Sequence, residues 1–176
     1  RIGKEKNVYF LLEAMRKLII EKKRQNVHFL LIGGGDELEN AKNLIRKWGL
    51  SNHITFTGGL PKDETNKIFG GADCFIFASV TETQGIIIQE AQASGLAVIA
   101  VNKMGPSDYI HDNIDGLLSP LNINDFTDKM EYILTHPDER EKLRKNAKIN
   151  VQEFTAEKSA EKMERVYIDA KNCNRS

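Results

Sequence analysis

The sequence predicts an α/β fold in which a parallel sheet is covered by helices on both faces. Short, largely apolar runs alternate along the chain with segments of helical spacing. Glycine-bearing turns at 33–35, 58–59 and 85 each follow one of these runs. Strands that alternate with helices are typical of a parallel sheet with right-handed crossovers, and ligands bind such sheets at the carboxyl ends of the strands.

The first half of the chain is expected to supply three helices and three strands. The segment 7–24 is helical because its apolar residues recur every three or four positions, and it ends in a charged run. A strand follows at 27–32, then a helix from Asp36 to Gly49, a short strand at 54–57, a small helix at 63–69 and a strong strand at 74–78. Strands that are apolar along their length are typical of a sheet covered on both faces.

The second half begins with a helix that runs from Gly85 to Gly95, a natural stop signal. A strand is expected at 97–101, a short helix from Gly105 and a short final strand at 116–118. From about residue 125 the pattern is helical, with helices at 126–134, 138–151 and 156–170. The sequence predicts one domain, 1–176, which is long enough to bury a sizeable core.

Composition excludes several classes of protein. The chain has 25 Lys and Arg and 25 Asp and Glu, so its net charge is zero, which argues against nucleic acid as a partner. The apolar runs are all shorter than the 18 or so residues that a membrane span needs. Cys74 and Cys173 are far apart and are expected to be reduced thiols, which suits a cytoplasmic setting.

The stretch 81–95 is the strongest candidate site. It combines a strand, a turn at Gly85 and a helix N-terminus, where first-turn N–H groups and the positive end of the helix dipole favour an anion. Glu82 lies in the turn, and Glu90 lies about five residues into the helix, roughly 7–8 Å along its axis. This separation suits a nucleotide diphosphate, with phosphates at the helix mouth and a ribose beside Glu90.

Seven ordered motifs cover nearly the whole chain. They are Arg1-x4-Lys6-Asn7, 31–35 (Leu-Ile-Gly-Gly-Gly), 56–58 (Phe-Thr-Gly), Ala72-Asp73, Glu82-x7-Glu90 with Ala91-x-Ala93-x-Gly95-x-x-Val98, Gly105-x-x-Asp108-x-Ile110, and 116–118 (Gly-Leu-Leu). Together they resemble the signature of retaining glycosyltransferases of family 4. The resemblance is to the C-terminal, donor-binding half of the two-domain GT-B fold, a Rossmann-like sheet, and it implies that the N-terminal acceptor domain is absent. It also implies that the terminal helix, 154–172, braces that missing domain.

The resemblance implies that Arg1 and Lys6 hold the donor's diphosphate and act in catalysis. Fixed cations stabilise the charge that a leaving nucleoside diphosphate gains in the transition state. Enzymes without such cations often use Mg²⁺ held by an Asp-x-Asp pair. The chain contains no Asp-x-Asp, and its four His lack the spacing of metal ligands. We therefore expect no metal and no cofactor.

The resemblance assigns the two acids different partners. Glu90 matches the acid that binds the ribose hydroxyls, and a carboxylate can accept from both vicinal hydroxyls. Glu82 matches the acid that contacts hydroxyls of the transferred sugar. The backbone N–H groups of Thr83, Gln84, Gly85 and Ile86 are candidates for sugar and phosphate contacts. Thr83-Gln84 departs from the family's commoner Gly-Phe and resembles bacterial members that glucosylate diacylglycerol or build cell-surface polysaccharides.

Three further residues are candidates for nucleotide contacts. Gly33 and Gly35 face the nucleotide in this interpretation, although a strand-to-helix turn explains them equally well. Leu60 matches the family position that packs near the base, and plain packing is the alternative. Basic clusters at 16–24 and 142–148 are candidates for a peripheral contact with the inner face of a membrane, but interspersed acids favour a solvated helix face.

The leading hypothesis is a fragment of a retaining glycosyltransferase that moves a hexose from a UDP-linked donor to a hydroxyl of a lipid or cell-surface polysaccharide. Because the acceptor domain is absent, we expect the fragment to bind nucleotide but turn over little. The second hypothesis is a dinucleotide-binding oxidoreductase domain. The segment 33–38 lacks the third fingerprint glycine, and Asn52 and His53 stand where an acid is expected. A third hypothesis is a non-catalytic module that uses the sheet as a scaffold.

Overall fold

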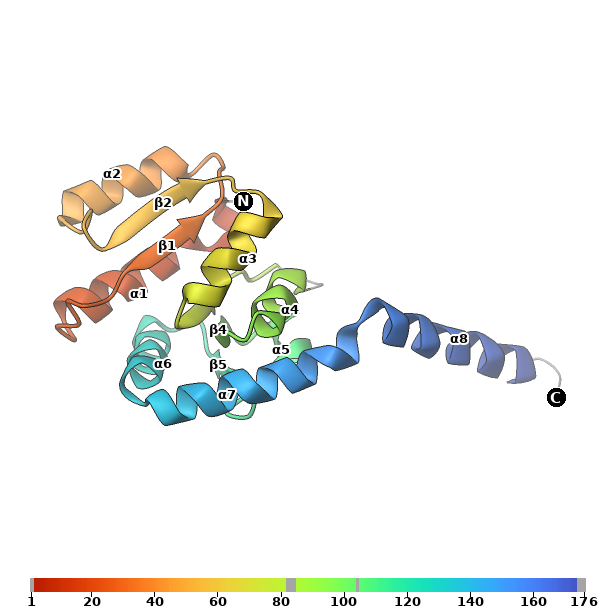
Figure 1. Cartoon of the computed structure of the whole chain (residues 1–176). Coiled ribbons are helices and arrows are strands. Elements are labelled where there is room, and N and C mark those ends of the chain that lie inside the picture. Colours follow the sequence, from red (N-terminus) through yellow and green to blue (C-terminus); the bar gives the residue numbers. More distant parts are fainter. Residues whose placement is uncertain (1, 82–84, 104, 174–176) are drawn as a thin grey trace.

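The computed structural model describes residues 2–81, 85–103 and 105–173 (Figure 1). The elements are η1 (Lys4–Lys6), α1 (Val8–Ile20), β1 (Phe29–Ile32), α2 (Leu38–Trp48), β2 (Ile54–Gly58), α3 (Lys62–Gly71), β3 (Cys74–Phe77), α4 (Ile86–Ala93), β4 (Ala97–Val101), α5 (Pro106–Tyr109), β5 (Leu117–Ser119), α6 (Ile123–Thr135), α7 (Pro137–Asn150), η2 (Val151–Phe154) and α8 (Ala156–Cys173). The predicted order of helices and strands is confirmed throughout the described residues.

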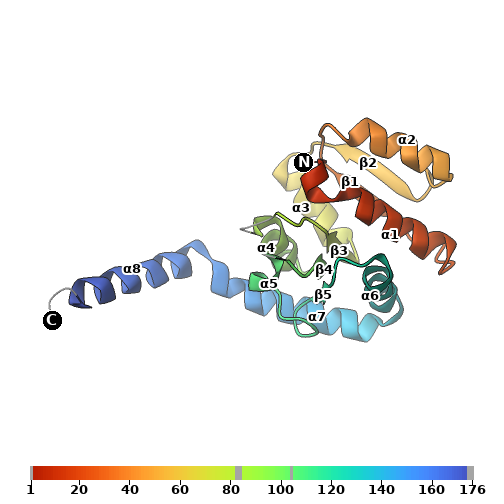
Figure 2. The same ribbon diagram turned by 180° about the vertical axis from the view of Figure 1, so that it is seen from behind.

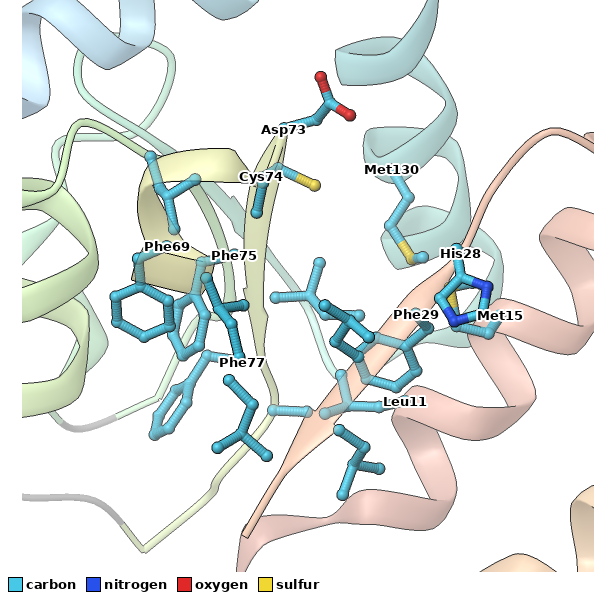
Figure 3. Close-up of a pocket in the computed structure, with 18 of the residues that line it drawn as sticks. Leu11, Met15, His28, Phe29, Phe69, Asp73, Cys74, Phe75, Phe77 and Met130 are labelled. Carbon is cyan, nitrogen blue, oxygen red and sulfur yellow. The ribbon is translucent and has the colours of Figure 1, made fainter. Parts of the chain in front are cut away.

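All strand pairs between these elements are parallel, and the predicted α/β class is confirmed. The strands form two hydrogen-bonded groups: β1 pairs with β2, and β3, β4 and β5 pair in that order. The sequence led us to expect one sheet. β1 and β3 instead diverge around a cleft that is lined by bulky side chains of both strands (Figure 3).

Helices cover both faces of the three-stranded sheet, as predicted. All five residues of β4 are buried, and their side chains alternate between two apolar clusters. Ala97, Ile99 and Val101 pack in the cluster that holds α1 and α6, whereas Val98 and Ala100 pack with α4. This double coverage explains why β4 is apolar at every position.

Helix α1 packs against α2 and α6 in the first of these two clusters. Its buried residues recur at helical spacing, and they include Leu12, Leu18 and Ile19, each at most 1% exposed. Phe10 packs edge-on against Phe126 of α6, with ring centroids 5.2 Å apart. The C-terminal end of α1 is fixed to α6 by ion pairs of Lys22 and of Arg24 with Glu131, at 3.0 and 2.8 Å.

The C-terminal helix α8 leaves the body of the molecule after η2 and runs away from it (Figures 1 and 2). Its large apolar side chains are exposed, and they are Met163, Val166, Tyr167 and Ile168. In the described part of the chain, no helix has the length and apolar character that a membrane crossing needs.

Candidate functional site

The turns that follow β1 and β2 lie side by side. The backbone N–H of Gly33 donates to the carbonyl oxygen of Gly58 at 2.8 Å, and the two residues form an isolated bridge. Leu60 follows Gly58 by two residues and is half-buried. The predicted positions Gly33 and Leu60 are therefore brought to neighbouring turns by the parallel pairing of the two strands.

The N-terminal segment lies across the ends of both sheets. The N–H of Ile2 donates to Gly34 at 2.8 Å, and a side chain at position 35 would meet the carbonyl oxygen of Ile2 at 2.2 Å. Gly35 thus leaves room for the backbone of this segment. At its other end, the buried hydroxyl of Ser79 donates to the carbonyl oxygen of Glu5 at 3.0 Å.

These contacts place Lys6 at the carboxyl end of β3. Its ammonium group lies 6.0 Å from the centre of the Phe77 ring, within range of a cation–π interaction. Phe77 is the last residue of β3, so Lys6 stands at the edge of the sheet where parallel α/β folds bind ligands.

Helix α4 begins at the same edge. Gly85 has a positive φ of 58°, which glycine adopts without strain, and its carbonyl oxygen accepts from the N–H groups of Ile88 and Gln89 at 2.8 and 3.2 Å. Ile86, the first residue of the helix, is 56% exposed. The positive end of the α4 dipole is therefore presented at the sheet edge.

Glu90 lies one turn further into α4 and forms an ion pair with Lys62. Its Oε1 is 2.9 Å from Lys62 Nζ, and the two side chains are 30% and 75% exposed. Lys62 is the first residue of α3, so the start of α3 lies beside the middle of α4. An ion pair this exposed contributes little stability and can exchange its partner readily.

A cleft of about 820 Å³ runs between β1 and β3 from this edge into the molecule. Figure 3 shows Phe69, Phe75 and Phe77 on one side of β3, and Leu11 and Phe29 on its other side, next to β1. Lys6, Ile86 and Glu90 also line it. A cation, a helix N-terminus and a carboxylate therefore share one cleft with an apolar wall.

The predicted site residues are distributed unevenly. Lys6, Ile86 and Glu90 line the cleft, whereas Gly33, Gly35, Leu60 and Gly85 are not among the residues that line it. Arg1, Glu82, Thr83 and Gln84 lie outside the described residues. Among the residues that the structure does describe, no group of three or more His, Cys, Asp or Glu side chains is arranged to hold a metal ion.

Sequence reasoning missed two polar residues of this edge. Lys62 was one position outside the predicted helix at 63–69, yet a lysine directly after Pro61 at a helix start was a visible signal. Ser79 follows β3 and fixes the N-terminal segment, but only the folded chain shows a hydroxyl that is fully buried and bonded to a residue 74 positions away.

The fold and this sheet-edge site define a class of protein, the GT-B glycosyltransferases. TarM of Staphylococcus aureus superposes with a TM-score of 0.86 at 25% identity, over 95% of this chain and 33% of TarM. Sucrose-phosphate synthase of Thermosynechococcus elongatus superposes with a TM-score of 0.85 at 25% identity, over 98% of this chain and 44% of the synthase.

Sequence comparison identifies the family within this class. Residues 1–150 match the family described as Glycosyl transferases group 1, and the chain belongs to that family. It is 30% identical over 169 residues to alpha-monoglucosyldiacylglycerol synthase of Acholeplasma laidlawii, covering 96% of this chain and 42% of that protein. It is also 30% identical over 158 residues to the sulfoquinovosyl transferase SQD2 of Arabidopsis thaliana, covering 88% and 29%. The chain thus spans less than half the length of these relatives.

Proposed function

We propose that the chain is the donor-binding half of a retaining glycosyltransferase of family 4. In this proposal it transfers a hexose from a UDP-linked donor to a hydroxyl of a lipid or cell-surface polysaccharide acceptor. The observation that carries the proposal is the convergence of Lys6, the start of α4 and Glu90 on one cleft. Family membership favours this hypothesis over the dinucleotide-binding oxidoreductase.

The geometry suggests separate positions along α4 for the diphosphate and for the ribose of the donor. Ile86 and Glu90 are four positions apart, about 6 Å along the helix axis. A diphosphate at the helix mouth would lie near the Lys6 ammonium, and the ribose would then lie beside the Glu90 carboxylate. Glu90 would accept hydrogen bonds from both ribose hydroxyls and release Lys62 as it does so.

Lys6 and the helix N-terminus would act in the transition state. When the bond between the sugar and the diphosphate breaks, the leaving diphosphate gains negative charge, and fixed cations and N–H groups stabilise that gain. Arg1 is proposed to add a second cation, and Glu82 to bind hydroxyls of the transferred sugar. The acceptor hydroxyl then bonds to the same face of the sugar and loses its proton to a group of the acceptor half.

The proposed reaction needs no metal and no cofactor. Lys6 and the α4 N-terminus provide the positive charge that a metal ion would otherwise supply to a diphosphate. The experiment is direct: UDP should bind equally well with and without excess EDTA. A strict requirement for Mg²⁺ or Mn²⁺ would overturn this part of the proposal.

The acceptor class is suggested by the relatives. Two of them, from Acholeplasma laidlawii and Streptococcus pneumoniae, are alpha-monoglucosyldiacylglycerol synthases. The resemblance at Thr83-Gln84 points the same way. We propose that the whole enzyme works in the cytoplasm at the inner face of a membrane. Flotation of the chain with vesicles of anionic lipid tests whether this half contributes to that contact.

One calorimetric titration tests the proposed function. The purified chain should bind UDP with a micromolar to millimolar Kd, and Glu90→Ala should abolish the binding while the matched exposed-acid variant Glu64→Ala leaves it intact. GDP is the competing nucleotide, because a relative from Mycobacterium tuberculosis is GDP-mannose-dependent. Preferential binding of NADH would support the oxidoreductase, and no binding of any nucleotide would support the scaffold.

A further inference from the structure

Tyr109 lies directly against the turn that opens α4. A side chain at position 85 would place its Cβ 2.7 Å from Cδ2 and 3.0 Å from Cε2 of the Tyr109 ring. The ring therefore occupies the space in which such a side chain would stand. Since Gly85 is buried, the turn cannot move toward α5 without displacing Tyr109.

The Tyr109 ring also contacts the segment that leads into α8. Phe154, the last residue of η2, packs edge-on against it, with centroids 5.0 Å apart and planes at 70°. The ammonium group of Lys162 in α8 lies 5.9 Å from the centre of the Phe154 ring. The two rings thus form a continuous contact from the base of α8 to the α4 turn.

The backbone of Tyr109 is also fixed to the helices on either side. Its carbonyl oxygen accepts from Gln92 Nε2 of α4 at 3.3 Å and from Asn150 Nδ2 of α7 at 3.2 Å. Gln92 is fully buried, so water does not compete for its amide group. Tyr109 therefore contacts α4 through Gly85 and Gln92, and it contacts α7 and η2 through Asn150 and Phe154.

We propose that Tyr109 is a positioning residue for the donor site, and that Phe154 acts on the site through it. The inference rests on the proposed function and extends it. Gly85 packs tightly against the Tyr109 ring. The position of η2 and of the start of α8 therefore determines the position of the α4 N-terminus. A misplacement of about 1 Å in a binding group is enough to weaken it strongly.

Nucleotide affinity provides the first test. By titration with UDP, Tyr109→Ala should raise Kd about tenfold and Phe154→Ala about fivefold. The double variant should bind no more weakly than Tyr109→Ala, because in this proposal Phe154 acts on the site through Tyr109. Tyr109→Phe keeps the ring and should bind as wild type. Tyr132→Ala removes a tyrosine ring on α6 and is the matched control, also expected to bind as wild type.

Hydrogen exchange separates positioning from general destabilisation. In Tyr109→Ala and Phe154→Ala, exchange should accelerate at the N–H groups of Ile88 and Gln89, whose acceptor is the Gly85 carbonyl oxygen. Exchange in β4 should stay at the wild-type rate. If acceleration spreads evenly to β4, or if Tyr109→Ala leaves both the Kd within twofold and the α4 exchange unchanged, the inference is wrong.

The two proposals fail in different ways. If the wild-type chain binds no nucleotide, the proposed function fails, and the exchange experiment alone decides whether Tyr109 positions the α4 turn. If the wild type binds UDP and the variants bind it equally well, the positioning role fails and the proposed function stands.

Discussion

Replacing Glu90 by Gln changes one charge at the centre of the proposed site and little else. The shape of the side chain is kept, while the ion pair with Lys62 at 2.9 Å is lost. Hydrogen bonds to a charged group contribute about 1.5–3 kcal/mol, and Glu90 is 30% exposed, so the lower half of that range applies. We therefore expect the Kd for UDP to rise about 10- to 30-fold, since about 1.4 kcal/mol corresponds to a factor of ten.

The stability of this variant should hardly change. The Lys62 side chain is 75% exposed, and exposed ion pairs contribute about 0–1 kcal/mol. In a domain of this size about 1 kcal/mol shifts Tm by roughly 2–4 °C, so the melting temperature of Glu90→Gln should stay within that range of wild type. A loss of binding at nearly constant Tm would separate recognition from folding.

The decisive ligand is UDP that lacks both ribose hydroxyls. If Glu90 binds the ribose, wild type should bind 2′,3′-dideoxy-UDP about as weakly as Glu90→Gln binds UDP, and the substitution should cost nothing further with this analogue. Glu64→Gln, an exposed acid on α3, is the control and should behave as wild type. The reasoning is refuted if Glu90→Gln binds UDP within twofold of wild type, or weakens both nucleotides equally.

Three further predictions follow from the described contacts. Lys6→Met should raise the Kd for UDP about tenfold at low salt but leave uridine binding unchanged, because Lys6 is assigned to the diphosphate; calorimetry at two salt concentrations measures both, and equal losses would contradict the assignment. Burial, with the Asp73 carboxylate adding to it, raises the pKa of the Cys74 thiol to about 12 from 9.0. In a Cys173→Ser background, iodoacetamide at pH 8 should therefore label folded chain at least about a hundredfold more slowly than chain unfolded in urea, by mass spectrometry. The same raised pKa favours the protonated folded state, so Cys74 should make stability fall as pH rises from about 9 toward 12. Hydrogen bonds from Lys22, and to a smaller extent from Arg24, lower the pKa of the Glu131 carboxyl below its ordinary value of 4.5. Glu131 therefore stabilises the fold above pH 4.5, and this stabilisation is lost as the pH falls through the pKa of the folded state. The Tm of Glu131→Gln should accordingly be lower than that of wild type at pH 7 and equal to it at pH 2. An equal difference in Tm at both pH values would show that packing, not charge, is responsible.

The order of helices and strands was predictable because the spacing of apolar residues in each segment matches the element that the segment forms. The apolar run at β4 is fully buried, and the helical spacing of α1 matches its buried residues. The predicted ends of the elements were less accurate. The strand was predicted to begin at Val27, but β1 begins at Phe29, because Val27 and His28 do not pair with β2. Local pattern identifies an element well and its ends poorly.

The separation of β1 from β3 was not predictable. Both runs are apolar and both are typical of interior strands, so local sequence favours a continuous sheet. Side chains of both strands line the cleft between them, and how these side chains pack is a property of the tertiary structure. Whether two strands so far apart in the chain pair with each other leaves no local signal in a single sequence.

At the site, the structure adds a role for one glycine that the sequence pattern did not supply. Gly35 was assigned to the nucleotide or to a turn, whereas its missing side chain makes room for the backbone of Ile2. Tyr109 had no predicted role, because its importance comes from contacts with Gly85 and Phe154, which lie 24 and 45 positions away. The spacing of a motif indicates the residues that contact a ligand more readily than the residues that hold them in position.

The N-terminal segment gives these separate observations a common explanation. It is hydrogen-bonded to the first sheet at Gly34 and to the end of β3 through Ser79, and it places Lys6 against Phe77 between them. The candidate cation is thus held by both sheets, while α4 and Glu90 belong to the second sheet alone.

A nucleotide that contacts Lys6 and Glu90 together would bind only when the two sheets keep this spacing. By mass action a ligand stabilises the state that it binds, by about 2.7 kcal/mol at a hundred times Kd. The segment formed by residues 2–6 is therefore as much a part of the proposed site as the start of α4, and its contacts at Gly35 and Ser79 explain why a glycine and a serine stand at those two positions.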